Sequence, residues 1–321
     1  MNRRELLTTA AGLSALFTVE SLLTRTSAFA SPRFEDFDPQ TPGPLSTVKL
    51  TDHLAVIMGD GGNIAVLTGD EGTLQVDSGY ANQAADLTKA IGELTAQPVT
   101  TLINTHWHLD HVGGNEAVGK GGARIIAQKS TRARMATDQT IEFMNMHTPP
   151  SPAIALPVIT FAENLTLYAN GEEIAMTHVA PAHTDTDIVV YFRKANVLHA
   201  GDLLFNGFYP FIDYSSKGWI GGMVAGLDLI LKFSNATTKI IPGHGPMATK
   251  AEVAAFRTML HTIQTRVEPM VKSGKTAAQV VAAKPTKDFD AKWGGGFLKP
   301  DQFATLAYTG IARHRGIPVH A

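Results

Sequence analysis

The chain contains no cysteine, and this absence excludes several kinds of chemistry at once. Disulfide bonds, Cys-ligated zinc, iron–sulfur clusters and a thiol nucleophile are all ruled out. Charged residues make up only 17% of the 321 residues, and the formal net charge is −2. The basic excess typical of nucleic-acid-binding proteins is therefore missing, and no nucleic-acid partner is expected. Any metal ion must be held by histidine and carboxylate side chains.

Long hydrophobic runs are also missing, apart from one near the N-terminus. Residues 1–30 contain the pair Arg3 and Arg4, then an apolar stretch, then a small-x-small pattern that ends at Ala30. This order is typical of a Tat-type signal peptide, and the stretch is too short for a stable membrane span. We expect the Tat translocase to export the protein to the periplasm, with residues 31–321 as the mature domain. A frayed helix of a cytoplasmic protein is the alternative.

The rest of the chain alternates between β-type and helical patterns. Short β-type runs separated by Gly and Asp begin near residue 48, and a second set covers residues 165–192. Helical periodicity is found at residues 81–94, 130–146, 222–234, 250–272 and 276–283. Strands followed by helices, twice over, predict an α/β (α+β) fold of two stacked sheets with helices outside. We expect a four-layer αβ/βα sandwich whose part from about residue 250 to 321 is helical.

The most informative segment reads HWHLDH, residues 106–111, and follows an apolar β-type run. A regular strand or helix cannot aim four potential ligands at one place, but a loop at a strand end can. His106 and His108 face the same side of an extended chain and are suited to share one metal ion. Asp110 and His111 would then turn toward a second. Imidazole and carboxylate ligands suit Zn²⁺, and they are also compatible with Fe or Mn.

Three further candidate ligands follow or precede β-type runs later in the chain. His183 lies in PAHTD, Asp202 in HAGD and His244 in PGHG. The Pro and Gly residues around them allow tight loops and a close approach of the backbone. The remaining seven histidines, including His199, lack such surroundings, and we expect core or surface roles for them.

These motifs, in the order HWHLDH, PAHTDTDIVVYF, HAGD and PGHG, resemble those of the metallo-β-lactamase superfamily over roughly residues 45–250. The resemblance implies an αβ/βα sandwich with the metal site at the edge between the two sheets. It also implies a glyoxalase II-like set of seven ligands for two Zn²⁺ ions per chain, with Asp202 as the bridge. The ligands of one ion would be His106, His108 and His183, and those of the other would be Asp110, His111 and His244.

This ligand set predicts a metal-dependent hydrolase acting on a small molecule. Two divalent ions about 3.5–4 Å apart can hold a hydroxide at neutral pH, which would attack the carbonyl of an ester, thioester, lactone or amide. Asp110, or a water on the metal, would protonate the leaving group. A β-lactamase proper is an alternative. The common lactamase subclass has Cys at the position of Asp202 and a carboxylate-binding Lys three residues later, where this chain has Phe205.

Two further features bear on the site. Asp77 matches a buried acidic residue of the superfamily, and we interpret it as a hydrogen-bond partner that orients the HWHLDH loop or a ligand histidine. The alternative is an Asp that only initiates a turn. The window 203–220 is the most aromatic of the chain and directly follows Asp202. It predicts an apolar wall for a hydrophobic substrate, although packing of the sandwich edge explains it equally well. The predicted wall residues are Phe205, Phe208, Tyr209 and Trp219.

Three other classes of protein compete with a dinuclear hydrolase. A mononuclear iron oxygenase acting on persulfides would need only two His and one Asp, and would not use His111 or His244 as ligands. A nuclease is disfavoured because phosphate binding recruits Lys and Arg. A structural zinc protein needs only four ligands, whereas seven around two ions favour open, reactive coordination.

Overall fold

The structure is a computed structural model, and it describes residues 43–320 of the chain. The segment interpreted as a signal peptide, residues 1–30, lies outside these residues, so its export function stays a prediction. Within the described part, no helix combines the length and apolar character needed to cross a membrane.

Seven strands form the first sheet. They are β1 (Ser46–Lys49), β2 (Leu54–Met58), β3 (Ile64–Leu67), β4 (Thr73–Val76), β5 (Val99–Ile103), β6 (Arg124–Gln128) and β9 (Ile159–Phe161). Their order in the sheet is β1-β2-β3-β4-β5-β6-β9. Neighbours are antiparallel up to β4 and parallel from there on. Parallel neighbours need a crossover, and the helices between β4 and β6 are α1 (Ala84–Gly92), α2 (Leu109–Val112) and α3 (Asn115–Lys120).

Five strands form the second sheet. They are β10 (Asn164–Ala169), β11 (Glu172–His178), β12 (Ile188–Phe192), β13 (Val197–His199) and β14 (Lys239–Ile241). They lie side by side in chain order. All neighbours are antiparallel except β13 and β14, which are parallel because a helix separates them in the chain. The pattern predicted over residues 165–192 corresponds to β10, β11 and β12.

Helices from the last third of the chain accompany the second sheet. They are α5 (Ile220–Phe233), α6 (Lys250–Lys272), α7 (Ala277–Ala282), α8 (Asp290–Trp293) and α9 (Pro300–His314). Helix α6 begins at a capping box, in which the Thr249 side chain accepts from the Glu252 amide and the Glu252 carboxylate accepts from the Thr249 amide. Both interactions satisfy amides that have no partner inside the helix, and so they fix where the helix starts.

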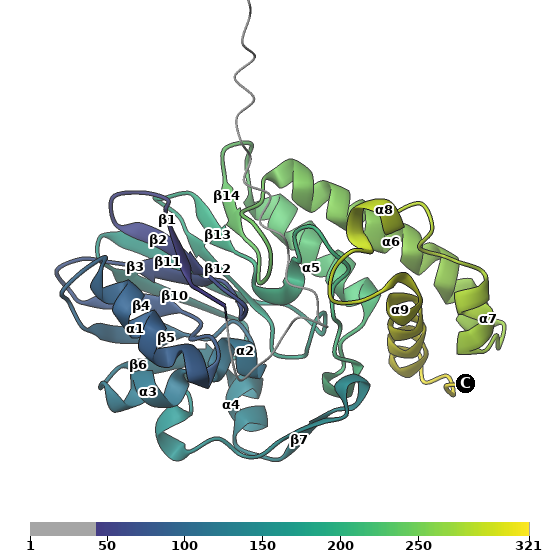
Figure 1. Cartoon of the computed structure of the whole chain (residues 1–321), viewed down its shortest axis with the longest axis horizontal. Helices are drawn as coiled ribbons and strands as arrows, with labels where there is room; N and C mark the ends of the chain where they lie inside the picture. Colours follow the sequence, from purple (N-terminus) through teal and green to yellow (C-terminus); the bar gives the residue numbers. More distant parts are fainter. Residues whose placement is uncertain (1–42, 321) are drawn as a thin grey trace, which may run out of the picture. The chain divides into compact units, whose positions relative to one another are not determined.

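Alternate residues of single strands belong to different apolar layers. In β2, Val56 packs between the two sheets, whereas its neighbour Ile57 packs on the outer face against Leu87 of α1. In β12, Val190 joins the layer between the sheets, and Val189 faces α5 and α6. Figure 1 shows α1 on one side of the paired sheets and α5 and α6 on the other. The predicted four-layer αβ/βα sandwich is thereby confirmed.

The helix predicted near residues 130–146 is wrong beyond its first turns. The segment consists of α4 (Lys129–Met135), β7 (Gln139–Ile141), a 3₁₀ turn (Glu142–Met144) and β8 (Met146–Thr148). β-Branched Thr140 favours a strand, and Asn145 has a φ of 49°, which does not continue a helix. Arg313 of α9 forms an ion pair of 2.6 Å with Glu142 in the turn of this hairpin. This contact joins distant parts of the chain, so a local pattern cannot reveal it.

Asn63, just before β3, links the two sheets beside the site described below. Its Nδ2 donates to the carbonyls of Pro242 and Gly245, each at 2.9 Å. Its backbone amide donates to the Gly243 carbonyl at 2.7 Å. Its own carbonyl accepts from Nε2 of buried His199 at 2.8 Å. One side chain and its peptide groups thus fix the loop after β14 against the first sheet.

Replacing Asn63 with Ala should lower the free energy of unfolding by about 2–4 kcal/mol, because two carbonyls lose their donor and each unsatisfied buried group costs about 1–3 kcal/mol. Urea denaturation measures the change. The matched control Asn164→Ala, at an exposed position of β10, should shift stability by no more than about 0.5 kcal/mol. Equal effects of the two substitutions would contradict this role of Asn63.

Candidate metal centre

The candidate ligands all lie at one edge of the paired sheets. The HWHLDH segment, residues 106–111, follows β5 after two residues; His106 and His108 lie in the loop as expected, whereas Asp110 and His111 lie in α2. Asp202 and His244 follow the ends of β13 and β14, which are parallel and therefore end at the same edge. His183 precedes β12, and because β12 runs antiparallel to β13, this residue comes to that edge as well. The topology therefore gathers side chains that are up to 138 positions apart in the sequence, as between His106 and His244.

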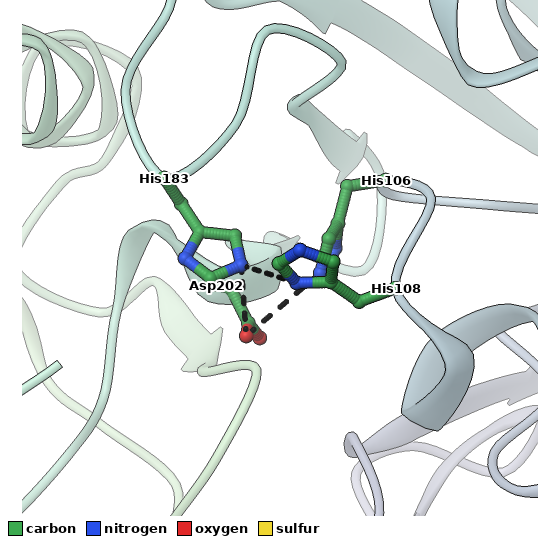
Figure 2. A group of neighbouring side chains, drawn as sticks. All are labelled: His106, His108, His183 and Asp202. Atoms are coloured by element: carbon green, nitrogen blue, oxygen red, sulfur yellow. Dashed lines mark hydrogen bonds and ion pairs between the residues drawn. The ribbon is translucent and has the colours of Figure 1, made fainter. Parts of the chain in front are cut away.

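The first group of donors consists of His106, His108, His183 and Asp202, whose ligand atoms all lie within 4.8 Å of one another. Figure 2 shows the three imidazoles pointing toward one another and toward the carboxylate below them. Nε2 of His183 lies 2.9 Å from Nδ1 of His108 and 3.4 Å from Oδ2 of Asp202. Nε2 of His106 lies 3.8 Å from the same oxygen. All four side chains are buried.

The second group consists of Asp110, His111, His244 and again Asp202, also within 4.8 Å. Nε2 of His244 lies 3.0 Å from Oδ2 of Asp110 and 3.4 Å from Oδ2 of Asp202. Nε2 of His111 lies 3.1 Å from Oδ1 of Asp202. The side chains of His244 and Asp110 are 18% and 19% exposed, whereas that of Asp202 is 4% exposed. His244 and Asp110 therefore face the opening of the site. The structure thus brings together all seven predicted ligands, with Asp202 common to both groups.

Four of the imidazoles have their second nitrogen engaged by the protein. His108 Nε2 donates to Oδ2 of Asp213 at 3.2 Å, and His183 Nδ1 donates to the Phe211 carbonyl at 2.9 Å. His111 Nδ1 donates to Oδ2 of Asp77 at 2.7 Å. His106 Nδ1 lies 3.1 Å from the hydroxyl of Thr105. These contacts fix the ring orientation, and in a neutral ring they place the lone pair on the nitrogen that faces the centre.

That arrangement suits bound cations. With their outer nitrogens protonated, His108 Nδ1 and His183 Nε2 turn two lone pairs toward each other at 2.9 Å. Among the described residues, buried His106 Nε2 has no hydrogen-bond partner, and the only partner of His111 Nε2 within 3.1 Å is Oδ1 of Asp202. Buried polar atoms without partners are costly, and a cation would satisfy them. The donor set of imidazole nitrogen and carboxylate oxygen fits Zn²⁺, and it also accepts Fe or Mn.

The charges inside the site divide between the two groups. Burial lowers the pKa of His183 to about 4, and burial and neighbouring imidazoles hold the pKa of His106 well below its usual range. Burial also acts on His244, but the carboxylates of Asp202 and Asp110 outweigh it and raise the pKa of His244 to about 9. The same carboxylates raise the pKa of His111. Without a cation, His244 and His111 therefore hold protons at neutral pH, whereas the rings of His106 and His183 are neutral.

Asp77 lies beneath the HWHLDH segment. Besides His111, its carboxylate accepts from the Thr105 amide at 2.7 Å and from the Thr105 hydroxyl at 2.6 Å. Its backbone has a φ of 64°, an unusual conformation that is maintained by the surrounding contacts. The side chain thus makes more contacts than a turn-initiating Asp would need. Its effect on metal binding stays a prediction.

The four predicted wall residues separate into two pairs. Phe205 stacks on the imidazole of His244 with ring centroids 5.1 Å apart, and Phe208 contacts Phe205. Tyr209 is instead buried, with its ring stacked on Phe303 and its hydroxyl bonded to Asp290 at 2.8 Å. Trp219 stacks on His314 of α9 at 3.6 Å. The interpretation of Tyr209 as part of a substrate wall is wrong, because its ring is fully buried against α8 and α9. That of Trp219, which is partly buried, stays a prediction.

Sequence reasoning missed three supporting residues. Asp213 holds His108, the Phe211 backbone holds His183, and the carboxylate of Asp187 accepts from the amides of His183 and Thr184 at 2.8 and 2.9 Å. An acidic residue inside the aromatic window was the available signal for Asp213. His199, as expected, is a core residue, because both of its nitrogens are engaged by backbone groups.

A profile described as "Metallo-beta-lactamase superfamily" matches residues 57–261, which is more than half of the chain and includes all seven candidate ligands. The chain therefore belongs to the metallo-β-lactamase superfamily, and it carries a His/Asp cluster able to bind metal ions.

Individual relatives are distant. The metallo-beta-lactamase type 2 of Bacillus sp. (strain 170) is 24% identical over 205 residues, 63% of this chain and 71% of that protein. The metallo-beta-lactamase type 2 of Bacteroides fragilis is 23% identical over 147 residues, 46% and 53% of the two chains. The 2,4-dinitroanisole O-demethylase subunit alpha of Nocardioides sp. (strain JS1661) is 25% identical over 187 residues, 56% and 51%. The chain spans about half the length of the last two relatives.

Solved structures show the same fold at low identity. A metallo-beta-lactamase from Pontibacter korlensis has a TM-score of 0.56 and 19% identity, covering 68% of this chain and 99% of that one. The sec-alkylsulfatase Pisa1 from Pseudomonas sp. has a TM-score of 0.62 and 16% identity, covering 83% and 50%. At these identities the likeness concerns the fold.

Asp77→Asn should weaken zinc binding by about 10–100-fold, since a carboxamide cannot accept all three hydrogen bonds and His111 loses its orientation. Competition with a chromophoric chelator measures the affinity. Asp70→Asn, in an exposed turn, is the matched control and should bind zinc as the unmodified protein does. An unchanged affinity in Asp77→Asn would show that Asp77 acts only on the turn.

Zinc binding should release protons, because the pKa of His244, raised to about 9, and the raised pKa of His111 leave both rings protonated at pH 7. Only neutral imidazole binds zinc, so saturation at pH 7 should release about two protons per chain, and zinc affinity should rise with pH toward 9. Calorimetry in buffers of different ionisation enthalpy counts these protons. His244→Asn should release about one fewer. No release at pH 7 would contradict the charge assignment.

Proposed function

We propose that the protein is a dinuclear zinc hydrolase that attacks the carbonyl of an ester, thioester, lactone or amide. The observation that carries the proposal is the pair of complete donor groups that share Asp202. Two Zn²⁺ ions held there would supply Lewis acidity and a water molecule of lowered pKa. No Ser or Cys nucleophile is required.

The second group of donors is complete, and this favours two bound metal ions over one. A mononuclear iron oxygenase would leave Asp110, His111 and His244 without a role as ligands. Here the three converge on Asp202, and Asp77 orients His111 by a hydrogen bond of 2.7 Å. A closed structural site would leave no ligand accessible, whereas Asp110 and His244 remain partly exposed.

Asp110 is the residue we expect to move a proton. The pKa of this carboxyl falls to about 2, because His111 and His244 together outweigh the effect of burial. Oδ2 of Asp110 therefore accepts a proton from the nucleophile only transiently, which suits a group that passes it on to the leaving group. Its 19% exposure supports a position on the substrate side of the site.

A β-lactamase proper remains the second candidate because two relatives carry that name. The position three residues after Asp202 holds Phe205, whose ring stacks on His244 at 5.1 Å. No ammonium group is supplied there for a substrate carboxylate. This favours esters, thioesters and lactones without a carboxylate over β-lactams.

We further propose that the protein acts in the periplasm after export by the Tat translocase, which accepts folded proteins. The proposal rests on the arginine pair Arg3 and Arg4 and the small-x-small pattern ending at Ala30. Zinc loading would then precede export.

Activity of the zinc-loaded protein should be measured on nitrocefin, acyl-homoserine lactones, thioesters and aryl esters. We expect hydrolysis of at least one carbonyl substrate, and a loss of at least about 100-fold in kcat/KM in His108→Ala, because the first ion loses a ligand. His53→Ala, at an exposed position outside the site, is the matched control. Full activity in His108→Ala would overturn the proposed mechanism.

A further inference from the structure

A cavity of about 570 Å³ lies between the β7–β8 hairpin and the C-terminal helices. It is lined by Phe143 and Met144 of the hairpin turn, by Phe297 and Leu298 before α9, and by Val281, Asp301, Gln302 and Thr305. This volume falls in the range of ligand sites for small organic molecules, which are mostly apolar with a few polar groups. None of these residues belongs to the metal centre.

One aromatic ring connects this cavity to the metal centre. Phe211 contacts the rings of His108 and His183, in each case with centroids 5.9 Å apart. On its other side it contacts Phe143 at 5.9 Å and Phe297 at 6.4 Å, which are two of the cavity's lining residues. Phe211, which is 4% exposed, therefore lies between the ligand histidines and the cavity, and a single ring separates the two sites.

The hairpin wall of the cavity is anchored. Both oxygens of Glu142 accept from the guanidinium of Arg313, at 2.8 and 2.6 Å, and the Glu142 amide donates to the Ser215 hydroxyl at 3.0 Å. The guanidinium of Arg313 also lies over the ring of Tyr214 at 4.6 Å. Phe143 and Met144 directly follow Glu142, so these contacts hold them facing α9. A wall fixed in this way costs little further ordering when a ligand binds.

The charge of the residues that line the cavity determines whether it favours charged or uncharged ligands. Asp301 is the one charged residue among those that line the cavity, and it is negative. Arg313 of α9 is paired with Glu142. A carboxylate or sulfate on the ligand would meet no counter-charge among these lining residues, and burying an uncompensated charge is strongly unfavourable.

We propose that this cavity binds the uncharged, apolar chain or ring of the substrate, so that the protein prefers neutral esters, thioesters or lactones with a medium to long apolar group. This inference rests on the proposed hydrolase function, because it assigns the substrate class of the same site. Phe143, Met144, Phe297 and Thr305 are its specificity-determining residues.

Binding can be tested without activity, using the neutral fluorescent probe N-phenyl-1-naphthylamine on zinc-free and zinc-loaded protein. We expect saturable binding, with displacement by 1-decanol at a concentration at least about tenfold lower than by decanoate. Thr305→Trp fills the cavity and should weaken probe binding by at least about tenfold. Thr258→Trp is the matched control, since Thr258 is exposed on α6 and, like Thr305, donates its hydroxyl to the carbonyl four residues earlier.

Chain-length preference provides the second readout. With p-nitrophenyl esters, the ratio of kcat/KM for decanoate to acetate should fall at least about tenfold in Thr305→Trp relative to Thr258→Trp. Phe143→Ala, which removes wall area without adding bulk, should lower the same ratio about threefold or more, whereas Phe289→Ala outside the lining should not. If the Thr305→Trp variant does not fold, Phe143→Ala still tests the chain-length preference.

The outcomes separate the two proposals. If no carbonyl substrate is hydrolysed but the probe binds and Thr305→Trp weakens it, the hydrolase proposal fails and the cavity remains a site for neutral apolar ligands. If esters are hydrolysed while probe binding and the chain-length ratio are the same in Thr305→Trp and Phe143→Ala as in their controls, the cavity is not the substrate site. Equal displacement by decanol and decanoate overturns the charge selection.

Discussion

The carboxylate of Asp202 is the point on which the site depends, because both donor groups include it. It is buried among imidazoles from three segments, and its pKa lies well below the usual range because His244, His111 and His183 together outweigh the effect of burial. A buried carboxylate charge is tolerated only when the imidazoles that compensate it are held in place. The backbone contributes to this, since a Cβ at Gly243 would lie 1.9 Å from Oδ1 of Asp202. Glycine at this position lets the PGHG loop approach the carboxylate.

The way the two sheets are held together determines how closely the candidate metal ligands approach one another. His111 lies after β5 of the first sheet and Asp202 after β13 of the second, and Asn63 bonds the two sheets together between them. Gly62, next to Asn63, has no side chain, and a Cβ there would lie 2.2 Å from Cε1 of His111. The positions of the imidazoles and the stability of the fold therefore depend on the same contacts between the two sheets. Outer hydrogen bonds from Asp77 and Asp213 then fix which nitrogen faces the centre.

The sequence predicted the candidate metal-ligating residues better than it predicted the residues that surround them. HWHLDH, HAGD and PGHG are local patterns whose residue types state their chemistry, and alternating apolar residues indicated two sheets with helices outside. The 139–148 hairpin was missed because its main anchor, the ion pair between Glu142 and Arg313, spans 171 positions. Tyr209 was assigned to the wall because composition does not tell which face an aromatic ring covers. Asp213 acts through His108, 105 positions away, and nothing adjacent to it reveals that contact.

The proposed function depends on two cations that the paired donor groups would hold, with Asp202 between them. Anomalous diffraction at the zinc edge from crystals of the zinc-loaded protein tests it most directly. We expect two peaks about 3.5–4 Å apart, one beside His106, His108 and His183 and one beside Asp110, His111 and His244. A single peak at full zinc occupancy, or peaks away from these side chains, would contradict it.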